Sequence, residues 1–165
     1  MLCRSVEVMK DVTRQAGCVE LPNEEFLKEV CALIAEGRDV TLRVRGISMR
    51  PFLEDRRDKI VLTRPGVVKV GDAVLAEIAP GKFVFHRIIR IEGTQVTLKG
   101  DGNVYAVEQC GIQNIVASAK VFVRKERCYS PQSRVWRWYS AMWPHDALLR
   151  RVLLAIHRRL PQSWR

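Results

Sequence analysis

Ser48 has the surroundings best suited to nucleophilic chemistry. It stands in Gly46-Ile47-Ser48-Met49-Arg50-Pro51, directly after a strand-like segment that ends at Arg45. A glycine before the serine and a proline-restricted turn after it can leave the hydroxyl free and expose backbone N–H groups beside it. A serine nucleophile and its oxyanion hole need those groups. On its own, however, Gly-x-Ser is a common turn, so the motif does not establish a catalytic site.

His86 is the histidine best placed to act as a general base. It lies inside the strand-like run 83–91, whereas His145 and His157 lie in a basic C-terminal segment. Imidazole exchanges its proton near neutral pH, so a histidine close to a serine can accept the hydroxyl proton. A lone histidine in a strand is more often structural, so the role of His86 depends on its proximity to Ser48.

The elements that would position these residues are mainly β. A helix is predicted over residues 23–35, because Asn23 can cap it and apolar residues then recur at helical spacing. Downstream the apolar period changes to two, and the connections are too short for helical crossovers. We therefore expect a coiled, mostly antiparallel β-domain. Its predicted strands are 40–45, 59–63, 73–78, 83–91, 94–99 and 115–123.

Charge is concentrated in the C-terminal part of the chain. The protein has 165 residues and a formal net charge of +10, and residues 124–165 contain ten Lys or Arg, two acids and all four tryptophans. The 47% of apolar residues is enough for a core, which excludes a disordered basic protein. We expect a helical lead-in at 1–39, the β-domain at 40–124 and a basic, Trp/Arg-rich helical region at 125–165.

The helix expected after Pro144 is amphipathic. Its apolar side favours docking on a membrane surface or a partner over binding of nucleic acid. The alternative is that this side packs on the β-domain. The apolar face consists of Leu148, Leu149, Val152, Leu153, Ile156 and Leu160, and the opposite face of Arg150, Arg151, His157 and Arg158.

Other classes of site and location are disfavoured. The five cysteines are scattered without a C-x-x-C pair, so neither a metal site nor a disulfide framework is predicted, and no cofactor is expected. Reduced thiols favour the cytoplasm. No run approaches the roughly 20 apolar residues that span a bilayer, and the N-terminal residues lack the apolar core of a signal peptide. We expect a cytoplasmic protein that can contact a membrane peripherally through 134–165.

Four short motifs, taken together, resemble the type I signal peptidase superfamily, which also includes self-cleaving repressors. Ser48, Met49 and Pro51 match its Ser-Met-x-Pro box. His86 stands where most bacterial members have lysine, as in the endoplasmic-reticulum and archaeal branch. The resemblance covers about residues 40–123. The motifs, in order, are Gly46–Leu53, Gly71-Asp72, His86-Arg87-Ile88 and Gly100-Asp101-Gly102-Asn103.

The resemblance implies a serine endopeptidase that cleaves a peptide or precursor protein. Ser48 would be the nucleophile, His86 the general base, and Asp101 the third catalytic residue. Glu108 is a second acid seven residues later, but its spacing is not a clean match, so the identity of the third residue stays open.

The resemblance also leaves alternatives. Signal peptidases carry an N-terminal transmembrane anchor, which this sequence lacks, so the removal of secretory signal peptides is not implied. A membrane-anchored partner subunit is one way in which an anchor could be supplied. Repressors carry a DNA-binding domain, and the residues before position 40 show no helix-turn-helix pattern. The alternatives to a peptidase of signal-peptidase type are a self-cleaving repressor-type peptidase and a non-catalytic basic module that binds membrane or nucleic acid.

Overall fold

The residues that the structure describes are organised around one antiparallel sheet of eight strands. The computed structural model describes residues 23–144 and 146–161. The strand order is β1-β2-β7-β3-β4-β5-β6, and β8 pairs with the C-terminal end of β7. Register shifts between paired strands let the sheet coil. The strands are β1 (Val40–Arg43), β2 (Lys59–Thr63), β3 (Ala73–Ala79), β4 (Lys82–Glu92), β5 (Gln95–Lys99), β6 (Glu108–Gly111), β7 (Ile115–Arg124) and β8 (Arg127–Tyr129), with a 3-10 turn, η2 (Ile112–Asn114), before β7.

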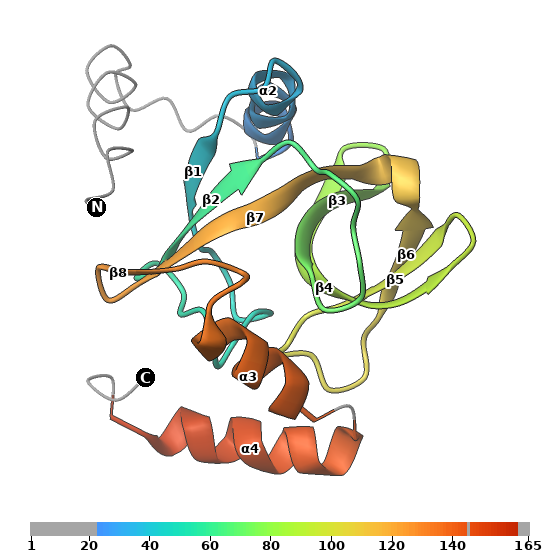
Figure 1. Cartoon of the computed structure of the whole chain (residues 1–165). Coiled ribbons are helices and arrows are strands. Elements are labelled where there is room, and N and C mark those ends of the chain that lie inside the picture. The colour runs from blue at the N-terminus through green and yellow to red at the C-terminus, as the bar shows by residue number, and fades with distance from the viewer. Residues whose placement is uncertain (1–22, 145, 162–165) are drawn as a thin grey trace.

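In the described part of the chain, three α-helices accompany the sheet: α2 (Asn23–Ala35), α3 (Arg134–Met142) and α4 (Ala147–Arg159). Figure 1 shows α2 at one end of the sheet and α3 and α4 at the opposite end. Ser133 caps α3 and Asp146 caps α4, each by accepting a hydrogen bond from a backbone N–H of the first turn. Within residues 23–144 and 146–161, none of the helices has the length and apolar character needed to cross a bilayer.

The predicted fold is confirmed. The helix at 23–35 and the antiparallel strands lie where the periodicity placed them, and helices follow Ser133. Two strands were not predicted. Strand β6 has only four residues, Glu-Gln-Cys-Gly, without apolar alternation, and β8 has three. Such short strands are defined by their pairing partners rather than by their own residues.

The main hydrophobic core draws on all three predicted segments. Val30 and Ile34 of α2 and Trp136 of α3 belong to the same buried cluster as Phe52 and Phe122. The Trp136 ring stacks on Phe122 with centroids 4.3 Å apart. Helices α2 and α3 are therefore integral to the β-domain. A second cluster comprises Val74, Ala76, Ile88, Val96, Leu98, Cys110 and Ile115.

Candidate active site

The turn that carries Ser48 follows β1 and is tied to the core. Gly46 has a φ of +89°, which favours glycine, and its N–H donates to Asp55 Oδ1 at 2.8 Å. Ile47 is exposed and Ser48 is half-buried. The turn is therefore fixed on one side while Ser48 stays near the surface. The residues that anchor it in the core are Met49, Phe52 and Leu53, all buried.

The loop Gly100-Asp101-Gly102-Asn103 packs directly against the backbone of this turn. The Gly102 N–H donates to the Ser48 carbonyl oxygen at 2.7 Å. A Cβ at Gly102 would lie 2.2 Å from the Ile47 carbonyl oxygen, and a Cβ at Gly100 would lie 2.5 Å from that of Ser48. Neither approach leaves room for a side chain. The two glycines are what allow the loop to reach the serine turn.

His86 is buried on β4 and contacts a carboxylate of β6. Its Nδ1 lies 2.9 Å from Glu108 Oε2. The sheet register accounts for this contact, because Ile88 of β4 and Glu108 of β6 both pair with Leu98 of β5. His86 shares a face of β4 with Ile88. The register therefore brings Glu108 close to the imidazole.

The other ring nitrogen of His86 lies beside Gly100, which packs on the serine turn. Nε2 lies 3.0 Å from the point where a Cβ on Gly100 would stand, and the Ser48 carbonyl oxygen lies 2.5 Å from the same point. When Nδ1–H donates to the carboxylate, Nε2 carries the lone pair and can accept a proton. His86 Nε2 and the Ser48 turn thus converge on Gly100.

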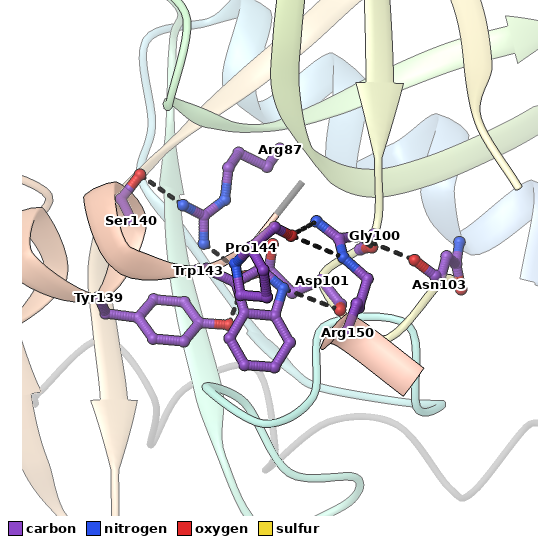
Figure 2. A network of polar contacts seen from close by, with 9 residues as sticks. All are labelled: Arg87, Gly100, Asp101, Asn103, Tyr139, Ser140, Trp143, Pro144 and Arg150. Carbon is purple, nitrogen blue, oxygen red and sulfur yellow. Dashed lines mark hydrogen bonds and ion pairs between the residues drawn. The ribbon is translucent and has the colours of Figure 1, made fainter. Parts of the chain in front are cut away.

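Asp101 is also buried, but its carboxylate is held by β4 and α3 (Figure 2). Oδ2 accepts from Arg87 Nη2 at 2.5 Å and from the Tyr139 hydroxyl at 2.8 Å. Burial, with the Asp101 carboxylate adding to it, raises the pKa of Tyr139 well above its usual value, so the hydroxyl remains a donor. The Asp101 carbonyl oxygen accepts from Trp143 Nε1 at 3.1 Å. Asp101 therefore fastens the loop to α3.

Arg150 fastens the same loop to α4. Its buried guanidinium donates from Nη1 to the carbonyl oxygens of Gly100, at 3.0 Å, and Asn103, at 2.9 Å. Nε and Nη2 donate to the Pro144 carbonyl oxygen at 3.1 and 2.9 Å (Figure 2). Burial lowers the pKa of Arg150 from its usual value, and the nearby Asp101 carboxylate opposes that shift. One arginine thus donates to three backbone carbonyl groups at the junction of the loop and α4.

Helix α4 directs part of its basic face toward the β-domain and most of its apolar face toward solvent. Arg150 and Leu154 are buried, and His157 is half-buried, with Nε2 3.2 Å from Glu54 Oε1. Arg150 and His157, both from the predicted basic face, therefore point into the protein, where backbone carbonyls and Glu54 provide polar partners for them. Packing of the apolar face on the β-domain is wrong for its four exposed residues, which are Leu148, Leu149, Val152 and Ile156.

Removing the Arg150 guanidinium should destabilise the protein. In Arg150→Met we expect a loss of about 1–3 kcal/mol in the free energy of unfolding, because three backbone carbonyl groups lose hydrogen bonds to a buried, charged guanidinium. Arg151→Met, on the exposed side of the same helix, is the matched control and should change it by about 0.5 kcal/mol or less. Denaturant unfolding of the full chain measures both values. Equal stability of the two variants would contradict the role given to Arg150.

The sequence matches the Peptidase S24-like family over residues 8–122, which is more than half of the chain. This chain belongs to that family. The resemblance to the signal peptidase and self-cleaving repressor superfamily is confirmed at this level. A comparison with curated proteins found no match.

Membership of the S24-like family supports a serine peptidase and is equally compatible with a self-cleaving repressor. The matched residues include Ser48, His86, Asp101 and Glu108. Helices α3 and α4 lie beyond the matched range, so the two helices that hold the Gly100–Asn103 loop are outside the part of the chain that matches the family.

The sequence-predicted site residues are only partly brought together. Ser48 and His86 lie against the same loop, whereas Asp101 binds Arg87 and Tyr139, and Glu108 is the carboxylate at His86 Nδ1. The sequence did contain Glu108 as a second acid, but its position depends on a four-residue strand that no periodicity revealed. Arg150 was overlooked because an arginine at that position in an amphipathic pattern is ordinarily solvated.

Proposed function

We propose that this protein is a serine endopeptidase of signal-peptidase type that uses Ser48 as its nucleophile and His86 as its general base. One observation carries the proposal. His86 has Nδ1 at a carboxylate and Nε2 directed at the loop that packs on the Ser48 turn. That arrangement is the one in which an imidazole can take a proton from a hydroxyl. The match to the S24-like family supports the same chemistry.

The proposed reaction follows from these positions. Ser48 Oγ attacks the peptide carbonyl carbon while its proton passes to His86 Nε2, and Glu108 stabilises the imidazolium through Nδ1–H. The Ser48 N–H is the proposed oxyanion donor. His86 then gives the proton to the departing amine, leaving an acyl-enzyme on Ser48. A water molecule, deprotonated by His86, hydrolyses this ester and restores the free serine.

The proposed substrate is a separate peptide or precursor protein, and cleavage of the chain itself is the alternative that the family match equally allows. The test incubates the purified full chain, and its Ser48→Ala variant, with a peptide library over a range of protein concentrations. We expect library peptides to be cleaved by the wild type and not by the variant. Cleavage of the chain alone, at a rate independent of its concentration, would support the repressor-type alternative. No Ser48-dependent cleavage of either kind would contradict the proposal and favour a binding module.

A further inference from the structure

The outer face of α4 exposes large apolar side chains to solvent. Leu148 is 71% exposed, Leu149 51%, Val152 53% and Ile156 53%. These positions recur at helical spacing, so they form one stripe along the helix. A contiguous apolar stripe of this kind, unlike scattered apolar residues, marks an interaction surface. Helix α3 adds three more exposed apolar side chains, Val135 at 47%, Trp138 at 67% and Met142 at 72%.

The same two helices are basic. Arg151 and Arg159 are exposed on α4, and Arg134 and Arg137 are exposed on α3. Residues 134–144 and 147–161 contain no Asp or Glu, and Asp146 between the helices caps α4. The outer surface therefore combines apolar side chains with positive charge that no acid of these helices offsets. Charge complementarity therefore favours an anionic binding partner for this surface.

The polar inner side of α4 explains why this surface remains uncovered by the β-domain. Arg150 is bound to the carbonyl oxygens of the Gly100–Asn103 loop, and His157 lies at Glu54. These contacts fix the rotation of the helix, so its apolar stripe cannot turn inward without breaking them. The stripe is consequently a feature of the folded protein.

We propose that the outer face of α4, together with the exposed side chains of α3, binds the surface of an anionic phospholipid bilayer. Leucine, valine and isoleucine side chains enter the boundary between headgroups and acyl chains, and arginines contact lipid phosphates. An exposed tryptophan suits that boundary because its ring is apolar and its N–H is polar. A fluid interface also adapts to stripes on two helices, whereas a protein partner would need a matching shape.

Binding at this face would place the candidate active site close to the membrane. The inner side of α4 contacts both the loop at Gly100 and Glu54, which follows the Ser48 turn. A bilayer bound to the outer side is therefore one helix away from these segments. The proposal goes beyond peptidase activity and does not depend on it, because the residues involved are distinct from Ser48 and His86.

Vesicle co-sedimentation of the full chain tests the proposal. The probes are vesicles of phosphatidylcholine alone and of phosphatidylcholine mixed with phosphatidylglycerol. We expect binding to the anionic vesicles, weakened by high salt, and little binding to the neutral ones. Val152→Glu should lower the partition coefficient at least about tenfold, because it places a carboxylate in the apolar stripe. The double variant Arg151→Gln/Arg159→Gln should lower the partition coefficient about fivefold for each arginine removed.

Val67→Glu is the matched control, because Val67 is fully exposed on the loop between β2 and β3. It should bind the anionic vesicles as the wild type does, and thermal unfolding should show that both glutamate variants are folded. The Ser48→Ala variant should also bind normally, which separates this proposal from the catalytic one. Failure of the wild type to bind anionic vesicles would overturn the proposal, as would equal loss in the two glutamate variants. A wild-type dimer that Val152→Glu converts to a monomer, without vesicle binding, would instead assign the face to a second copy of the chain.

Discussion

Ser48→Ala is expected to lower kcat/KM for peptide cleavage by about four orders of magnitude or more, because no other group can form the acyl-enzyme. The free energy of unfolding should change by about 0.5 kcal/mol or less, since the hydroxyl is half-buried in a turn that the following core residues anchor. Cleavage of the peptides identified with the library, together with thermal unfolding, measures both quantities.

A matched serine separates loss of the nucleophile from loss of a hydroxyl in general. Ser118 is also half-buried but lies on β7, in the middle of the sheet. Ser118→Ala should retain wild-type kcat/KM. His86→Ala should be as inactive as Ser48→Ala, and the double variant should be no worse than either, because the two groups act in one step. Substantial activity in Ser48→Ala would refute the assignment.

The second large effect distinguishes Glu108 from Asp101 as the acid that acts with His86. Glu108→Gln should lower kcat by about 100- to 10,000-fold, because an amide at His86 Nδ1 can hold the imidazole in the wrong tautomer and cannot stabilise its charged form. Glu108 is partly exposed, so the melting temperature should change little. Enzyme kinetics and thermal unfolding on the same preparations report the two effects separately.

Asp101→Asn should show the opposite pattern. Its carboxylate partners the buried Arg87 guanidinium, so the substitution leaves a buried cation without its counter-charge. Breaking such a pair costs about 3–5 kcal/mol of folding free energy. We therefore expect a large fall in melting temperature in Asp101→Asn. If instead Asp101→Asn lost kcat at unchanged stability while Glu108→Gln stayed active, the triad would be Ser48-His86-Asp101.

Glu108 and Asp101 show which part of the candidate site could not be predicted from the sequence. Ser48 and His86 could be singled out because a turn motif and a strand histidine are local features. The partner of His86 is decided by the pairing of β6 with β5, which places Glu108 opposite Leu98. Nothing in Glu108-Gln-Cys-Gly reveals that register. The Gly-Asp-Gly-Asn motif instead predicted Asp101 as the third residue. The structure shows the Asp101 carboxylate bound to Arg87 of β4 and Tyr139 of α3.

Helix α4 illustrates a second limit. Its position and its two faces were predicted from periodicity, as was the helix at 23–35. The direction of each face was not, because hydrophobic periodicity assumes that arginine prefers water. Arg150 is an exception, since the Gly100 and Asn103 carbonyl groups of one loop and the Pro144 carbonyl group before α4 converge on it. That convergence depends on the tertiary structure. The outward direction of the apolar stripe on α4 follows from it, so it could not be predicted from the sequence either.

Covalent labelling of Ser48 is the most direct measurement of the central claim. The full chain is treated with a fluorophosphonate, which forms a stable bond only to a serine activated by a base, and the modified peptide is identified by mass spectrometry. The account predicts one major adduct, on Ser48, that is lost in His86→Ala and strongly reduced in Glu108→Gln but retained in folded Ser118→Ala. Peptide cleavage by the wild type without an adduct on Ser48, or equal labelling of Ser48 in His86→Ala, would contradict it.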